Sequence, residues 1–219
     1  MNLNKRAARH AALGEEKRLQ IVDLLAAGDR TVTELADQIG VRGNLLAHHL
    51  QVLEEAELIE RRVSEGDHRR RYVSLRRSQI PPAIGTSYPR VDSIAFVCTA
   101  NSARSQFAAA LWTSVTGSEA ASAGMEPAAR VHPSAVRVAA EYGIDISDAI
   151  PNGYESLPGT VGLVISVCDR AREAGVPDTG ETLHWSVSDP VPKGSIQAFR
   201  DSFREISERV AHLAGAMRN

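Results

Sequence analysis

Short apolar runs alternate with helical segments throughout the second half of the chain, and this alternation limits the folds that the chain can adopt. Runs typical of strands occupy residues 93–98, 119–124, 161–168 and 182–190, and helical segments occupy residues 104–117, 132–143 and 195–217. Strands that alternate with helices form a parallel sheet with right-handed crossover connections. The sequence therefore predicts an α/β fold in this half, with helices flanking a parallel sheet.

Three reactive side chains lie at the ends of predicted strands in this half. Cys98 and Cys168 are the last residues of their apolar runs, and Asp189 is the next to last of its run. Because sites in parallel sheets lie beyond the carboxyl ends of the strands, we expect all three at the same edge. The chain contains two cysteines, and in a reducing compartment such a pair is more often catalytic or redox-active than a structural cross-link. The alternative is a pair of unrelated buried thiols.

The segment from Cys98 to Ser105 joins the first of these strands to a helix. Five residues separate Cys98 from Arg104, and a loop of this length can wrap backbone N–H groups around a tetrahedral oxyanion. The positive end of the helix and the planar guanidinium fork add to the same attraction, which also favours a nucleophilic thiolate. Asn101 is expected to hold the loop together, and Ser105 to donate to the sulfur. The predicted oxyanion-binding residues are Thr99, Ala100, Asn101, Ser102, Ala103, Arg104 and Ser105.

The first half reads as helices followed by a hairpin. Helical segments at residues 15–27, 33–40 and 44–57 precede a basic two-stranded segment at residues 58–75, which is the pattern of a winged helix-turn-helix. In the third helical segment, Leu45, Leu46, Leu50 and Leu53 are expected to form the apolar face. Residues 1–90 hold 15 Lys and Arg against 12 Asp and Glu, whereas the rest of the chain holds 10 against 15. A mildly basic half fits a polyanionic partner.

A proline-containing stretch without periodicity, residues 77–92, separates the two halves and is interpreted as a linker. The predicted domains are thus residues 1–76 and 93–219. No apolar run approaches the roughly 18 residues that a membrane span needs, and the first residues lack the apolar core of a secretory signal. We therefore expect a cytoplasmic protein without a membrane partner.

Residues 93–217 resemble the low-molecular-weight protein tyrosine phosphatase superfamily, which includes thioredoxin- and mycothiol-linked arsenate reductases. The motifs that carry the resemblance are VCTANSARSQ, GIDIS at 143–147, VISVCDRA at 164–171 and HWSVSDP at 184–190. The resemblance implies a four-stranded parallel sheet flanked by helices. It also implies Cys98 as nucleophile, Arg104 as anion clamp and Asp189 as general acid.

Departures from the phosphatase pattern favour arsenate over phosphotyrosine. Val191 and Pro192 follow Asp189-Pro190, where phosphatases usually carry tyrosines. Gln106 stands where phosphatases usually have proline, as in the arsenate reductases. The loop also carries Ala100 where the family often has glycine.

Cys168 occupies the position of the resolving cysteine of the reductases. Thioredoxin-linked members carry a further cysteine a few residues later, but residues 169–175 contain none. The resemblance therefore implies that Cys168 attacks Cys98, and that an external reductant completes the cycle. Mycothiol, glutathione or a redoxin would serve, and no bound cofactor is expected. The alternative for Cys168 is a small core residue, and for Asp189 a turn-forming residue before proline.

Residues 15–76 resemble the arsenic-repressor (ArsR-type) winged-helix family, through TVTELADQIGVRGNLLAHHLQVLEEAELIERR and EGDHRRRYVSL. The resemblance implies a homodimer on a pseudo-palindromic operator, with residues 43–55 as the recognition helix. Expected base contacts are Arg42, Asn44, His48 and His49, and expected phosphate contacts on the wing are Arg69, Arg70 and Arg71. The alternatives are a solvated helix face or a core position for the histidines, and a solvated wing tip for the arginines.

The first 90 residues contain no cysteine, so thiols of this half are not expected to sense arsenic. No His and Cys cluster has metal-ligand spacing, and no structural metal is expected. The leading interpretation is a DNA-binding regulator fused to an arsenate reductase. Two alternatives are a non-catalytic regulator that senses an oxyanion or redox state, and a phosphotyrosine phosphatase with a DNA-binding domain. The missing tyrosines argue against the last.

Overall fold

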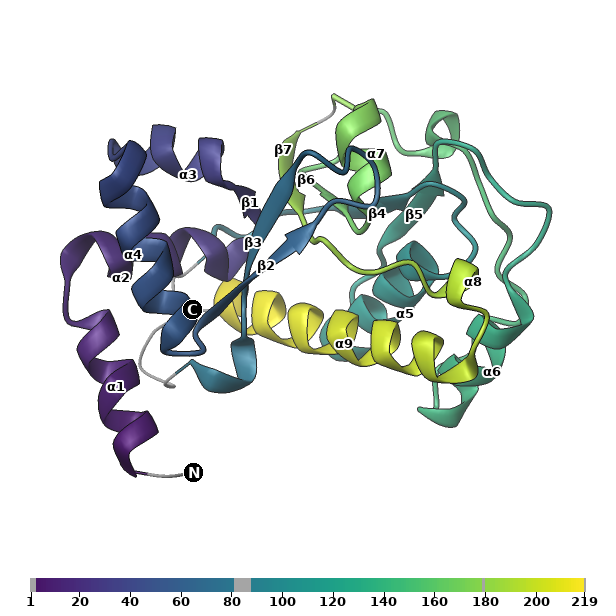
Figure 1. Cartoon of the computed structure of the whole chain (residues 1–219). Helices are drawn as coiled ribbons and strands as arrows, with labels where there is room; N and C mark the ends of the chain where they lie inside the picture. The colour runs from purple at the N-terminus through teal and green to yellow at the C-terminus, as the bar shows by residue number, and fades with distance from the viewer. Residues whose placement is uncertain (1–2, 81–87, 179, 219) are drawn as a thin grey trace. The chain divides into compact units, whose positions relative to one another are not determined.

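Figure 1 shows the fold of the chain, which a computed structural model describes for residues 3–80, 88–178 and 180–218. The linker predicted at residues 77–92 lies partly outside these described residues. Its first part contains a short 3-10 helix, η1 (Arg77–Gln79). No helix in the described ranges is both long enough and apolar enough to cross a bilayer.

The chain divides into two compact units, residues 1–64 with 68–86, and residues 65–67 with 87–219. The elements of the first unit are α1 (Leu3–Leu13), α2 (Glu16–Ala27), β1 (Arg30–Thr31), α3 (Val32–Ile39), α4 (Gly43–Glu55), β2 (Ile59–Val63) and β3 (Arg71–Leu75). The strands pair antiparallel in the order β1-β3-β2. Helix α4 matches the expected recognition helix, and the unit is the predicted winged helix-turn-helix. Helix α1 was not predicted.

Local signals explain where the helix-turn-helix begins and turns. Thr31 accepts a hydrogen bond from the backbone N–H of Glu34, and the Glu34 carboxylate accepts from the N–H of Thr31 at 2.7 Å. This reciprocal capping starts α3. Gly40, at a φ of 67°, ends that helix in the left-handed conformation, which costs glycine little.

The buried face of α4 differs from the expected one. Leu46, Leu50 and Leu53 lie in the core of the unit, as predicted, but Leu45 is 55% exposed. Residues 46, 50 and 53 follow the helical spacing of four and three, and residue 45 falls outside that stripe. Grouping Leu45 with the core face was therefore wrong.

The second unit is α/β, with a four-stranded parallel sheet in the order β5-β4-β6-β7 among its described residues. Its elements are β4 (Ile94–Cys98), α5 (Arg104–Thr116), β5 (Ala121–Gly124), α6 (Pro133–Glu141), η2 (Tyr154–Ser156), β6 (Leu163–Ser166), α7 (Asp169–Ala174), β7 (Glu181–His184), α8 (Pro190–Lys193) and α9 (Ile196–Arg218). Figure 1 shows α5 and α9 on one side of the sheet and α7 on the other. This architecture confirms the predicted fold class.

Large aromatic side chains hold the sheet to its helices. Phe107 of α5 and Phe203 of α9 pack edge to face, with ring centroids 5.1 Å apart, and Phe96 of β4 is fully buried. Burial of each such side chain stabilises the fold by about 1.5–3 kcal/mol. The core thus fixes β4 relative to α5, and the loop that joins them starts and ends on rigid elements.

Strand β7 is shorter than the sequence suggested. The expected strand ran to residue 190, whereas β7 ends at His184, which pairs with Ser166 at the end of β6. Because β6 also ends, at Ser166, the chain leaves the sheet after His184 and carries Asp189 across the carboxyl edge of the sheet.

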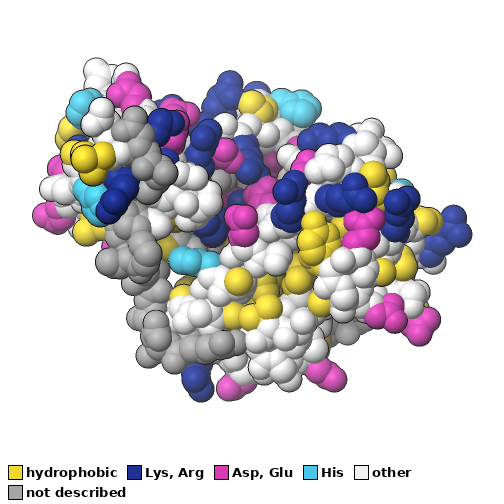
Figure 2. Space-filling view, turned by 90° about the horizontal axis from the view of Figure 1, so that it is seen from below, with side chains coloured by type: hydrophobic (Ala, Val, Ile, Leu, Met, Phe, Trp, Pro, Cys, Tyr) yellow, Lys and Arg dark blue, Asp and Glu magenta, His cyan; other side chains and the backbone are white. Residues whose placement is uncertain are grey.

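The surface of the molecule carries charged side chains of both signs. They are interspersed over the face shown in Figure 2, in keeping with a net charge of -2.

Candidate active site

Cys98 lies at the base of the loop between β4 and α5. It is the last residue of β4, and only 3% of it is exposed. The backbone N–H of Asn101 donates to its sulfur at 3.2 Å, and the Ser105 hydroxyl lies 3.0 Å from that sulfur. The contact with Ser105 is the one expected from the sequence. Because α5 begins at Arg104, its first N–H groups have no partner within the helix and face the loop end.

The carbonyl groups of the loop point away from its interior. Those of residues 98, 99 and 100 accept hydrogen bonds from the N–H groups of residues 125, 126 and 128, at 3.2, 2.9 and 2.9 Å. The carbonyl of Ser102 accepts from His132 at 2.8 Å. In a planar trans peptide the N–H points opposite to the C=O, so the N–H groups that follow these carbonyls turn inward. Successive inward N–H groups form a concave anion site.

Asn101 holds the loop in this shape. It is fully buried and has a φ of 48°, a left-handed conformation that persists only where the surroundings enforce it. Its amide nitrogen donates to the hydroxyls of Ser105 and Ser122, at 2.8 and 3.0 Å. Its side-chain oxygen accepts from the Asn152 N–H at 2.8 Å and from the Gln106 side chain at 3.0 Å. These bonds fix the shape of the loop from within the protein.

Gly124 fits the backbone of the loop closely. A Cβ at Gly124 would lie 2.7 Å from the carbonyl oxygen of Thr99 and 2.8 Å from the nitrogen of Asn101. Only glycine allows this approach.

The loop carries Ala100 at a position where related sequences often have glycine. Ala100 is not among the described residues with positive φ. Alanine at that position therefore adds no backbone strain.

Arg104 is the buried cation of the site. It is 5% exposed, donates to the carbonyl of Val187 at 2.9 Å and pairs with Asp189 at 3.0 Å. Burial alone would lower the pKa of this guanidinium, but the nearby Cys168, Asp189 and Cys98 outweigh it and raise the pKa above its ordinary value. Arg104 is thus a permanent positive charge beside both sulfurs.

Asp189 reaches the site from the chain that follows β7. One carboxylate oxygen accepts from the N–H of Val191 at 3.1 Å and so caps α8, while the other contacts Arg104. Its side chain is 24% exposed, which leaves it open to solvent. This position beside the guanidinium is compatible with the expected proton donor.

Cys168 lies at the start of α7, and 1% of it is exposed. Its sulfur accepts from the N–H of Ala171 at 3.4 Å and lies 3.4 Å from the hydroxyl of Thr99, the residue directly after Cys98. Burial raises the pKa of this thiol, with Arg104 acting in the opposite direction. Both cysteines are free thiols. The contact with Thr99, which sequence reasoning missed, brings the second thiol to the oxyanion loop.

The side chains expected at one edge of the sheet therefore do lie together. They are Cys98, Cys168 and Asp189, with Arg104 beside them, at the carboxyl ends of the strands. Ser122 and Asn152, which support the loop, were missed. Ser122 had a usable signal, because it lies near the end of the strand beside β4. Asn152 had none, since it comes from an irregular segment.

The residues expected to contact DNA separate into two groups. Arg42, directly before α4, is 80% exposed, and Asn44 and His48 are exposed on the helix. His49 is only 6% exposed, and its Nδ1 lies 3.4 Å from the carboxylate of Glu15. It falls on the core stripe of α4, so the expectation of a base contact for His49 was wrong. The wing residues Arg69, Arg70 and Arg71 are exposed.

Both halves of the chain are similar to known protein families. Residues 93–219 match the model of the low molecular weight phosphotyrosine protein phosphatase family, and residues 13–62 match a helix-turn-helix domain. The chain is 36% identical over 129 residues to an arsenate reductase from Brevibacillus brevis, covering 56% of this chain and 93% of that protein. It is 33% identical over 123 residues to one from Halalkalibacterium halodurans, covering 53% and 88%. A solved arsenate reductase from Archaeoglobus fulgidus superposes with a TM-score of 0.50 and 30% identity, covering 56% of this chain and 99% of that one.

Proposed function

Residues 93–219 make this chain a member of the low molecular weight phosphotyrosine protein phosphatase family, and from this premise we propose that its second half reduces arsenate. Cys98 is the nucleophile, and the helix-turn-helix half binds operator DNA. The observation that carries the proposal is the loop of inward N–H groups around a buried thiol, with a second thiol at its edge. Hydrolysis of a phosphate ester uses the first thiol as nucleophile, whereas reduction of arsenate also needs a thiol that can form a disulfide with it.

The first step is attack of the Cys98 thiolate on arsenic. The loop N–H groups and the guanidinium of Arg104 hold the oxygens of the tetrahedral anion. A sulfur–arsenic bond forms, and one oxygen leaves as water after Asp189 supplies a proton. Arsenic keeps its oxidation state in this step. Asp189 lies at the edge of the site, and its partly exposed side chain can take up a proton from solvent and pass it to the leaving oxygen.

The second step oxidises the two thiols. The sulfur of Cys168 attacks the sulfur of Cys98, a disulfide forms, and the electron pair of the sulfur–arsenic bond passes to arsenic. Arsenite leaves, and it takes up the proton that the Cys168 thiol loses. A disulfide needs alpha carbons within about 7 Å of each other. The position of the turn that carries Cys168 therefore controls this step.

An external thiol closes the cycle, because residues 169–175 offer no third cysteine. Mycothiol, glutathione or a redoxin would reduce the Cys98–Cys168 disulfide. The relatives named above are arsenate reductases, and the absence of tyrosines after Asp189-Pro190 also favours a small oxyanion over phosphotyrosine.

For the first half we propose operator binding as a homodimer. Exposed Arg42, Asn44 and His48 of the recognition helix would face the major groove, and Arg69, Arg70 and Arg71 of the wing would contact phosphates. The match to a helix-turn-helix domain supports DNA binding.

The missing third cysteine favours a second candidate function for residues 93–219. In this alternative the second half is a sensor that responds to an oxyanion or oxidant without turnover.

An arsenate-reduction assay on the purified full-length protein tests the proposal. Glutathione, mycothiol and a thioredoxin system are supplied in parallel, and p-nitrophenyl phosphate is offered as a phosphatase substrate. We expect arsenite to form with at least one thiol system and not in the Cys98→Ala variant. Hydrolysis of p-nitrophenyl phosphate without any arsenite would reject the reductase, and neither activity would favour the sensor.

A further inference from the structure

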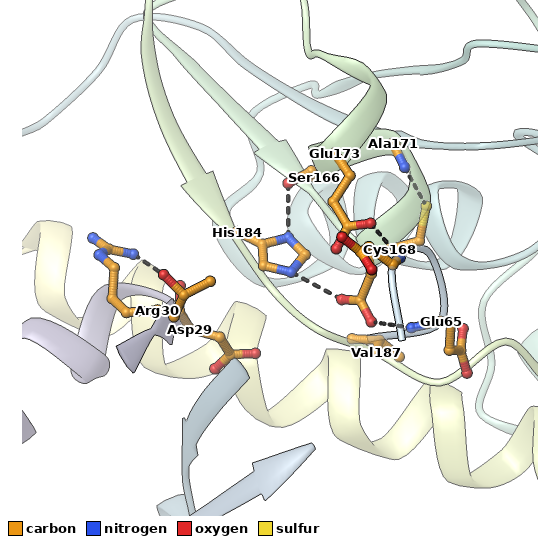
Figure 3. Close-up of polar contacts among 12 residues, drawn as sticks. Asp29, Arg30, Glu65, Ser166, Cys168, Ala171, Glu173, His184 and Val187 are labelled. Carbon is orange, nitrogen blue, oxygen red and sulfur yellow. Dashed lines mark hydrogen bonds and ion pairs between the residues drawn. The ribbon is translucent and has the colours of Figure 1, made fainter. Parts of the chain in front are cut away.

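A buried polar cluster lies directly behind Cys168 and has no part in the steps above. His184, the last residue of β7, bonds through Nδ1 to the Ser166 hydroxyl at 2.9 Å and through Nε2 to the Asp169 carboxylate at 3.0 Å. These three residues are 1%, 0% and 3% exposed. Figure 3 shows the His184 ring between Ser166 and the turn that carries Cys168. One imidazole therefore binds the residue two before Cys168 and the residue directly after it.

The protonation of this cluster follows from its contacts. Burial would raise the pKa of Asp169, but the hydrogen bond from His184 and further contacts outweigh it and lower the pKa below the ordinary value. Asp169 is therefore a carboxylate and can only accept hydrogen bonds. It follows that Nε2 of His184 carries a proton and donates it. A buried carboxylate bonded in this way is held firmly, because losing the His184 donor would remove part of what offsets its burial, although the backbone N–H of Glu65 also donates to it at 2.9 Å.

The cluster joins the Cys168 turn to the neighbouring strand. Trp185, the next residue after His184, donates its N–H to the carbonyl of Ser166 at 2.8 Å. Residues 166–169 are thus held to the end of β7 by this backbone bond, by the two side-chain bonds of His184, and by a contact of the Ser166 hydroxyl with the carbonyl of Leu183 at 3.3 Å. The sulfur of Cys168 is left beside Thr99, next to the oxyanion loop.

We propose that Ser166, His184 and Asp169 form a clamp that fixes the Cys168 turn for attack on Cys98, with His184 as the positioning residue. The inference rests on the proposed function for its role in arsenate reduction. Fixing two reacting groups near each other speeds their reaction by removing other orientations. Loosening the clamp should therefore have two opposite effects. Cys168 becomes more accessible to reagents from solution, and it forms the disulfide with Cys98 more slowly.

Two substitutions loosen the clamp to different extents. His184→Gln removes the ring and its contact with Ser166 and can keep only a single donor toward Asp169, whereas Ser166→Ala removes the hydroxyl and leaves the bond between His184 and Asp169 in place. His212→Gln, a change of the same type on α9, is the control. Each reduced full-length protein is treated with diamide, which accepts two electrons and two protons as the thiols become a disulfide. Samples are quenched by alkylation, and peptide mass spectrometry measures the Cys98–Cys168 disulfide and the alkylation of each cysteine.

We expect the Cys98–Cys168 disulfide to form about tenfold more slowly in His184→Gln than in the wild type, and at an intermediate rate in Ser166→Ala. In both variants Cys168 should be alkylated faster than in the wild type. The protection of Cys98 by phosphate should be unchanged. Rates equal to wild type in both variants would overturn the clamp, as would equal slowing in His212→Gln. If His184→Gln does not fold, Ser166→Ala alone decides the question by the same rates. Repeating the assay with arsenate as oxidant separates the two proposals. If diamide forms the disulfide more slowly in the variants than in the wild type, and arsenate forms no disulfide at all, the clamp proposal stands and the reductase proposal is rejected.

Discussion

Gly124→Ala is the substitution that tests the oxyanion loop most directly. The added methyl group would lie 2.7 Å from the Thr99 carbonyl oxygen and 2.8 Å from the Asn101 nitrogen. Both atoms belong to backbone and cannot rotate away, so the loop or β5 must shift. Overpacking of this kind typically costs about 1–3 kcal/mol. Because the Asn101 N–H is one of the donors that face Cys98, a shift there should also weaken oxyanion binding.

Thermal unfolding and anion protection measure the two effects separately. The phosphate concentration that half-protects Cys98 from alkylation gives the oxyanion affinity. Gly159→Ala is the matched control, since a Cβ there meets nothing within 4 Å and its φ is not positive. We expect Gly124→Ala to lower stability and to raise the anion concentration needed for half-protection, with Gly159→Ala near wild type. Wild-type stability and protection in Gly124→Ala would refute the close fit of loop and strand.

Four further outcomes follow from the candidate active site and the wing. Cys98→Ser should abolish arsenite formation with an unchanged melting temperature, and activity near wild type would reject the nucleophile. Arg104→Lys should weaken oxyanion protection about tenfold or more, because a point ammonium loses one charge-assisted bond of about 1.5–3 kcal/mol; unchanged affinity would count against the anion clamp. Arg70→Gln should weaken DNA binding at all sequences and reduce the salt slope by about one, and a sequence-dependent loss would contradict a phosphate contact. Cys168→Ser should stop arsenate-driven disulfide formation, with turnover restored only where a small thiol replaces the missing attack; normal turnover with a redoxin alone would make Cys168 a core residue.

The sequence located the chemistry because parallel strands end at one edge. Cys98, Cys168 and Asp189 each lie at the end of a strand that the sequence predicts, and a parallel sheet places those ends at one edge. The support of the loop could not be predicted in the same way. Asn101 is held by Ser122 and Asn152, which come from a neighbouring strand and an irregular segment, and their meeting depends on register and loop path.

The recognition helix shows a different limit. Leu45 and His49 were assigned to the wrong faces because residue type was given more weight than spacing. The stripe formed by residues 46, 50 and 53 places position 49 inside and position 45 outside. A leucine was thus left in solvent and a histidine buried beside Glu15, which hydrophobicity alone does not suggest.

The missing third cysteine determines what the second half does after one turnover. In the proposed reaction the Cys98–Cys168 disulfide is the last state that the chain reaches by itself, since residues 169–175 provide no thiol to attack it. Both sulfurs are buried, and burial raises the pKa of the Cys168 thiol, which makes it a slow leaving group. The disulfide therefore persists until an external thiol reaches it. Fast external reduction gives an enzyme. Slow reduction of the disulfide leaves the chain oxidised after one reaction with arsenate, and the same chain carries a helix-turn-helix. The lifetime of this disulfide against each candidate thiol is therefore the quantity that distinguishes reductase from sensor.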